Sequence, residues 1–186
     1  MSFSYLTSRK TIFICLAMLT LMVIGVLSVS ALAVAKDAAK TIPASVTIDK
    51  VYVDKSERVL KLLSGDKVIK TYHVALGDSP VGHKQQQGDE RTPTGHYILD
   101  YKNENSIAHR SIHISYPNTT DKARAKELGV SPGGNIMIHG QMNGFSHLAW
   151  FNQQRDWTDG CIAVTNAEMD EIMAVYKAGM PIEIVE

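Results

Sequence analysis

The chain begins with a long uncharged apolar run that limits what its N-terminal part can be. The run covers residues 11–35, and Arg9 and Lys10 come directly before it. Basic residues followed by such a run are typical of a secretory signal peptide or of a membrane anchor that is retained. The alternating alanines at its end provide cleavage sites, whereas its 25 residues also suffice to span a bilayer, which needs about 20. Either alternative predicts that everything after Lys36 is exported.

The exported part has the size of one domain. Residues 36–44 form a polar, alanine-rich linker, and we expect a single domain over residues 45–186. Because Arg9 and Lys10 are the only charged residues before position 36, 17 basic and 19 acidic residues remain, a net charge of −2. This balance argues against a nucleic-acid partner. We expect a monomer in the periplasm or cell envelope, attached to the inner membrane if the run at 11–35 is retained.

The exported part contains a single cysteine. Cys15 lies inside the apolar run, so Cys161 has no partner for an intramolecular disulfide. In an oxidising compartment, a leftover thiol is either paired with another molecule or kept for its reactivity. Cys161 lies between Gly160 and a short apolar strand, and the next question is whether its thiol is reactive or forms a disulfide with another molecule.

The residue pattern predicts a mainly β domain with a few short helices. Runs rich in β-branched and aromatic residues indicate strands, a capping box at Thr165 and Glu168 indicates a helix that ends at Gly179, and glycines and prolines indicate a long loop over residues 77–97. The expected strands are residues 45–54, 58–63, 67–76, 97–101, 111–116, 135–140, 162–164 and 181–186, and the expected helices begin near residues 119 and 165.

A thiol becomes an effective nucleophile when a histidine base favours the thiolate as an ion pair. His139 is the best candidate because it ends an apolar strand and is followed by Gly140, which permits a sharp turn. A carbonyl near that turn could accept the Nδ1–H and fix the tautomer. Gly160 would allow a substrate carbonyl to approach and would leave N–H groups near Cys161 free as an oxyanion hole. The alternative is that Cys161 is a small buried apolar residue.

The two motifs IMIHG and TDGC, in this order, resemble the signature of the L,D-transpeptidase catalytic domain family of the YkuD type. The stretches PVGHK, GDERTPTGHY, HISYPN and DWTDGCIAVTN fit the same family, so the resemblance extends from about Val46 to the C-terminus. It implies a sandwich-like β fold and cysteine-dependent acyl transfer on peptidoglycan stem peptides, which cross-links the wall or attaches a protein to it.

The resemblance also implies roles for individual residues. Cys161 would be the nucleophile and His139 the general base and acid, with Gly140 supplying the carbonyl that orients His139. Thr158 and Gly160 would shape the turn before the thiol. Tyr116 matches a tyrosine that family members place beside the oxyanion, and no metal or organic cofactor is implied.

The chain departs from the family pattern at two positions. Asp159 stands where many members have histidine, and Ala163 stands where they have arginine. An acidic neighbour opposes thiolate formation, so Asp159 either faces away, accepts a backbone N–H in the turn, or binds a substrate cation. Some family members hydrolyse stem-peptide linkages, and the departures leave this alternative open.

Further candidates for substrate binding lie in the long loop and beside the nucleophile. We expect His83 and Trp157 to line the cleft, and Lys84 and Arg91 to bind stem-peptide carboxylates; core packing for Trp157 and simple solvation for the charged residues are the alternatives. His109 and His113 have a spacing that binds zinc on a helix, but on the predicted strand they lie about 13 Å apart.

An alternative to an enzyme is a non-catalytic module that binds the cell wall. In that case Cys161 would form a disulfide with a partner protein.

Overall fold

The computed structural model describes residues 42–186. The predicted signal peptide or anchor at 1–35 and most of the predicted linker lie outside the described residues. Within residues 42–186, no helix has the length and hydropathy needed to cross a membrane.

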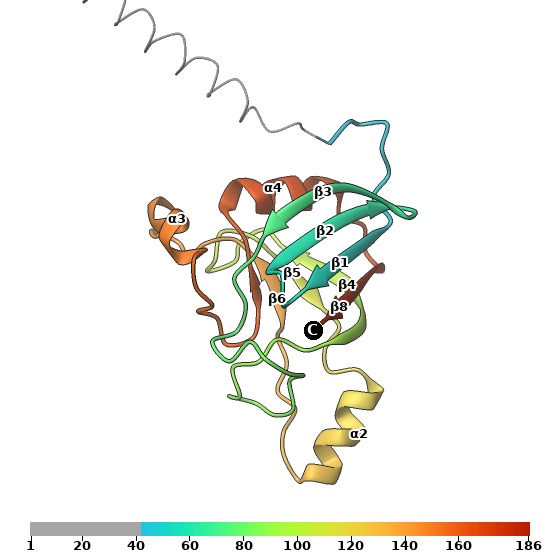
Figure 1. Ribbon diagram of the computed structural model, residues 1–186, viewed down its shortest axis with the longest axis vertical. Coiled ribbons are helices and arrows are strands. Elements are labelled where there is room, and N and C mark those ends of the chain that lie inside the picture. Colours follow the sequence, from blue (N-terminus) through green and yellow to red (C-terminus); the bar gives the residue numbers. More distant parts are fainter. Residues whose placement is uncertain (1–41) are drawn as a thin grey trace, which may run out of the picture. The chain divides into compact units, whose positions relative to one another are not determined.

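The domain is built on one eight-stranded sheet (Figure 1). The strands follow one another across the sheet in the order β3-β2-β1-β8-β4-β5-β6-β7. Neighbours are antiparallel except for β1 with β8 and β6 with β7. Their bounds are β1 (Lys50–Asp54), β2 (Val59–Ser64), β3 (Lys67–His73), β4 (Gly95–Asn103), β5 (Ser111–Ile114), β6 (Met137–His139), β7 (Ile162–Ala163) and β8 (Met180–Val185).

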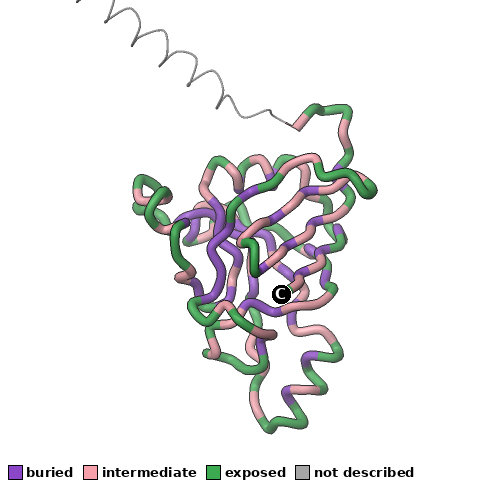
Figure 2. The backbone as a smooth tube through the Cα atoms, viewed as in Figure 1, coloured by how far each residue is buried: buried purple, intermediate pink, exposed green. Residues whose placement is uncertain are grey.

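The hydrophobic core joins both halves of this sheet. Leu62 of β2 and Val53 of β1 belong to the same buried cluster as Ile112 of β5 and Ile138 of β6. Figure 2 shows the buried positions gathered along the strands and the exposed ones along the loops. The prediction of a mainly β fold is therefore confirmed. The two layers expected of a sandwich-like fold are the two halves of one curled sheet. Apolar side chains alternate with solvent-facing ones along β1 and β8, as a half-buried strand requires.

Three short helices accompany the sheet: α2 (Thr119–Leu128), α3 (Ala149–Asn152), preceded by a 3₁₀ turn, and α4 (Asn166–Val175). The predicted capping box of α4 is present, since Thr165 Oγ1 accepts the Glu168 N–H at 3.3 Å and Glu168 Oε2 accepts the Thr165 N–H at 2.9 Å. The predicted end at Gly179 is wrong. Tyr176 already leaves the helical region, with ψ at 139°, and Gly179 instead lies in the turn before β8. The sequence pattern did not indicate α3.

The long loop spans residues 74–94 and runs alongside the segment that carries Cys161. Ala75 pairs with Ala163, and Gly77 pairs with Thr158. Asp156 strengthens this contact, because its Oδ1 accepts the Leu76 N–H at 2.9 Å while Arg58 donates to both of its carboxylate oxygens. The loop thus contacts the turn before Cys161 from outside the strands.

We predict that Ile138→Ala lowers the free energy of unfolding by about 2–5 kcal/mol, because it removes a side chain that is fully buried between neighbouring strands. Urea unfolding monitored by circular dichroism measures this change. Ile98→Ala is the control, since Ile98 on β4 is 44% exposed. Equal losses for the two variants would contradict the assignment of Ile138 to the core.

Candidate active site

Cys161 lies at the end of a turn that is closed by the side chain of Thr158. Thr158 Oγ1 donates to the Cys161 carbonyl at 2.8 Å and accepts the Gly160 N–H at 3.1 Å. The hydroxyl is buried, so both of its hydrogen bonds serve the turn itself. The Cys161 thiol emerges directly before β7, and its Sγ lies 3.6 Å from the Asn135 carbonyl oxygen.

Gly160 is required for a reason that differs from the expected one. Its φ of +121° is rarely adopted by residues with a side chain, and a Cβ there would lie 2.5 Å from the Arg91 carbonyl oxygen. The group that approaches Gly160 closely is thus the backbone of the long loop, at Arg91. The Gly160 N–H donates to Thr158 Oγ1, so it is not one of the free N–H groups expected near Cys161.

His139 ends β6 and is 8% exposed. Its Nδ1 lies 2.6 Å from the Gly140 carbonyl oxygen. Because a carbonyl can only accept, Nδ1 carries the proton and Nε2 is left with its lone pair. Gly140 cannot carry a side chain, since a Cβ would lie 2.7 Å from Asn166 Oδ1, which accepts the Gln141 N–H. The hydrogen bond to Gly140 fixes the tautomer of His139, and the contacts of Asn166 with Gly140 and Gln141 fix the end of β6.

His139 and Cys161 line the same cavity, whose volume is about 470 Å³. The Trp157 ring packs edge-on against the His139 imidazole, with centroids 5.7 Å apart. The other walls include Asn103, Ser106, Ile107, Ser111, Asn135, Met137 and Met142. Met137 belongs to the IMIHG motif, and Ser111 and Asn135 begin predicted strands, but the sequence analysis assigned none of these residues to the site.

Burial drives the two titratable groups toward their neutral forms. It raises the pKa of the Cys161 thiol, which the nearby Asp159 carboxylate raises further, while a backbone hydrogen bond and Lys84 act in the opposite direction. Burial also lowers the pKa of His139 below its ordinary value, against the opposing effect of the hydrogen bond to Gly140. Both shifts favour a thiol and a neutral imidazole over the ion pair that the sequence analysis expected.

Two of the expected substrate contacts lie away from this cavity. Tyr116 is buried in the core, where its hydroxyl donates to the Pro132 carbonyl at 2.9 Å. His83 Nδ1 lies 3.0 Å from the Thr94 carbonyl oxygen, and its Nε2 lies 3.1 Å from Asp121 Oδ1 at the start of α2. His83 thus links the loop to α2, and no local sequence pattern indicated this long-range contact.

The remaining candidates are divided between the site and its surroundings. Trp157, Thr158 and Asp159 line the cavity with the thiol. Lys84 is 3% exposed, pairs with Asp89 at 2.7 Å, and lines a second cavity. The Arg91 carbonyl packs against Gly160 in the turn before Cys161, and the Arg91 guanidinium lies near Gly82.

The histidines with zinc-like spacing are held apart by different carboxylates. His109 Nε2 lies 2.8 Å from Asp170, and His113 Nδ1 lies 2.7 Å from Asp100. Within residues 42–186, no three histidine, cysteine or acidic side chains are grouped as a metal ion would require.

Comparison with known proteins agrees with this geometry. Residues 48–184 match the family YkuD, described as the L,D-transpeptidase catalytic domain. The chain is 30% identical over 129 residues to the protein named "Putative L,D-transpeptidase YafK" of Escherichia coli K12, a match that covers 66% of this chain and 44% of that protein. The chain thus spans less than half the length of this curated relative.

Solved structures show the same fold. The helical cell shape determining protein Pgp2 of Campylobacter jejuni is similar with a TM-score of 0.57 and 25% identity, covering 76% of this chain and 49% of that one. Bd1075 of Bdellovibrio bacteriovorus is similar with a TM-score of 0.53 and 20% identity, covering 78% and 50%.

The family match covers most of the chain, including the strand end that carries His139 and the turn that carries Cys161. The chain belongs to the L,D-transpeptidase catalytic domain family.

Proposed function

We propose that this chain is a cysteine acyltransferase that acts on peptidoglycan stem peptides in the cell envelope. The observation that carries the proposal is the cavity shared by Cys161 and His139, in which the imidazole is held with Nε2 unprotonated. Family membership supports a peptidoglycan substrate, and the likeness to a helical cell shape determining protein supports a role in the cell wall. The apolar run at 11–35 supports export.

The reaction proceeds in two halves through one covalent bond to sulfur. In the first half, the thiol proton moves to His139 Nε2 as Sγ attacks a stem-peptide carbonyl, and the imidazolium then protonates the departing amine. The products of this half are a thioester on Cys161 and a free amine. In the second half, an acceptor amine attacks the thioester and its proton returns through His139 to the departing thiolate. Water as the acceptor gives hydrolysis by the same residues.

A neutral Cys161 thiol and a neutral His139 imidazole fit a mechanism in which His139 accepts the thiol proton while the sulfur attacks the carbonyl. A preformed thiolate would be stabilised poorly in this setting, because burial disfavours its charge and Asp159 repels it. A neutral imidazole can accept the proton as the carbon–sulfur bond forms, so no separated charges need to exist in the empty cavity. The Gly140 carbonyl then stabilises the imidazolium through Nδ1–H.

We predict that Cys161→Ala and His139→Ala each reduce the turnover of a defined stem peptide by at least about 100-fold, the range expected when a nucleophile or general base is lost. Their defects should not add in the double variant, because the two residues act as one unit. Mass analysis of the products measures turnover and also separates cross-linked from hydrolysed peptide. Circular dichroism checks the fold, and near-normal turnover by Cys161→Ala would refute the proposed nucleophile.

We predict that alkylation of Cys161 by iodoacetamide is slow at neutral pH and keeps rising above pH 8.5, the usual pKa of a free thiol. The reason is the sign of the shift: a raised pKa means that the thiolate appears only at higher pH. The measurement is the alkylation rate at each pH, followed by intact mass, with glutathione as the reference thiol. Fast, pH-independent alkylation between pH 5 and 7 would indicate an ion pair and contradict the neutral resting state.

A further inference from the structure

Asp156, in the segment that leads to Cys161, is paired with an arginine that lies far away in the sequence. Its Oδ2 accepts a hydrogen bond from Arg58 Nη2 at 2.8 Å, and both of its carboxylate oxygens lie within 3.1 Å of Arg58 Nε. The Arg58 side chain is 30% exposed and that of Asp156 is 14% exposed. An arginine that holds a carboxylate at two points fixes its direction as well as its distance. Neither residue lines the two cavities beside Cys161, so both lie outside the space that a substrate would occupy there.

Arg58 has a backbone conformation that is unfavourable for an arginine. It lies in the turn between β1 and β2 with a φ of +53°, in the left-handed region where glycine and asparagine are common. A turn that needed only this conformation would be more stable with glycine, so the arginine points to a use for its side chain. The Arg58 carbonyl also accepts the Val74 N–H at 2.9 Å. Arg58 therefore holds the start of the long loop through its backbone and Asp156 through its guanidinium.

Leu76 of the long loop connects Asp156 to the turn before Cys161. The Leu76 N–H donates to Asp156 Oδ1 at 2.9 Å. The Leu76 carbonyl accepts the N–H groups of Trp157 and Thr158, each at 3.1 Å. Because the Leu76 side chain is fully buried in the core, the loop is a fixed support for these three consecutive residues.

Trp157 and Thr158 each contact one of the two proposed reacting groups. The Trp157 ring packs edge-on against the His139 imidazole, with centroids 5.7 Å apart. Thr158 Oγ1 donates to the Cys161 carbonyl at 2.8 Å. A displacement of residues 156–158 would therefore move the imidazole and the thiol relative to each other.

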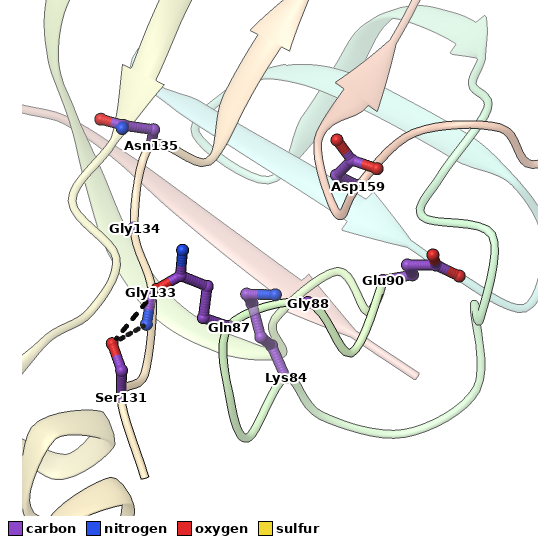
Figure 3. A pocket seen from close by; sticks show the side chains of 9 residues that line it. All are labelled: Lys84, Gln87, Gly88, Glu90, Ser131, Gly133, Gly134, Asn135 and Asp159. Atoms are coloured by element: carbon purple, nitrogen blue, oxygen red, sulfur yellow. Dashed lines mark hydrogen bonds between the residues drawn. The ribbon is translucent and has the colours of Figure 1, made fainter.

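The long loop and the turn before Cys161 also enclose the second cavity, whose volume is about 700 Å³. Lys84 and Glu90 of the loop line this cavity together with Asp159 of the turn (Figure 3). Lys84 lowers the pKa of the Cys161 thiol, whereas Asp159 raises it. The placement of the loop against the turn thus affects the surroundings of the thiol as well as the direction of its side chain.

We propose that Arg58 and Asp156 are positioning residues for acyl transfer, and that their ion pair holds residues 156–158 so that Cys161 Sγ and His139 Nε2 keep the geometry needed for attack. This inference rests on the proposed function and adds to it two residues that do not contact the substrate. Because the pair sets the placement of the reacting groups and binds nothing itself, its loss should slow attack and leave donor binding unchanged.

The test follows thioester formation in a single turnover with a stem tetrapeptide, by acid quench and intact mass. Arg58→Gly removes the guanidinium and leaves a residue that suits the backbone conformation, while Asp156→Asn keeps the size of the side chain and removes its charge. We expect each variant to lower the rate constant at saturating donor by about 10-fold to 100-fold, as when reacting groups are misplaced by up to about 1 Å. The half-saturating donor concentration should change by less than about twofold, since only the attack itself is affected.

Two further variants separate positioning from a general loss of stability. The double variant Arg58→Gly/Asp156→Asn should be no slower than the slower single variant, because the two residues act as one unit. Arg58→Lys keeps the charge but not the two-point contact, and it should recover part of the rate lost in Arg58→Gly. Urea unfolding checks that each variant is folded under the assay conditions.

Glu183→Gln is the matched control. It breaks the ion pair of Glu183 with Lys50, which joins β8 to β1 at comparable exposure, and Glu183 lines neither cavity. Its rate constant should equal that of the unaltered protein. If Arg58→Gly and Asp156→Asn form the thioester at the unaltered rate, if their losses multiply in the double variant, or if Glu183→Gln loses as much, the positioning role is refuted and the proposed function stands. If the unaltered protein forms no thioester at Cys161, the proposed function itself fails, and the positioning role fails with it.

Discussion

The parallel pairing of β6 with β7 is the constraint on which the site depends. In this register Ile138 faces Ile162 and His139 faces Ala163. Side chains alternate along a strand, so the two isoleucines point into the core while His139 and Cys161, two residues before Ala163, share the opposite face. A shift of one residue would turn the histidine into the core and an isoleucine into the cavity. The same hydrophobic contacts that stabilise the sheet therefore also hold the proposed nucleophile and base side by side.

Burial in this setting has chemical consequences. It lowers the pKa of His139 and raises the pKa of Cys161, so both groups are held toward their neutral forms. Lys84 lowers and Asp159 raises the pKa of the thiol, and both residues line the second cavity.

The sequence predicted much of the fold, because its signals are local. Alternating apolar residues predicted the strands, and the capping box predicted the start of α4. The paired motifs around His139 and Cys161 also fall on one cavity. What could not be predicted depends on contacts between distant segments. The Arg91 carbonyl against Gly160, the burial of Tyr116 and the pairing of His83 with Asp121 are of this kind.

The most direct test of the account is to trap the covalent intermediate. The protein would be mixed with a stem tetrapeptide, quenched with acid within the first turnover, and analysed by intact mass and by peptide mapping. The account predicts an adduct with the mass of the acyl fragment, after loss of the departing amine, located on Cys161 and absent from Cys161→Ala. Turnover without any adduct on the protein under these conditions, or an adduct on a different residue, would contradict the claim that Cys161 carries the acyl group.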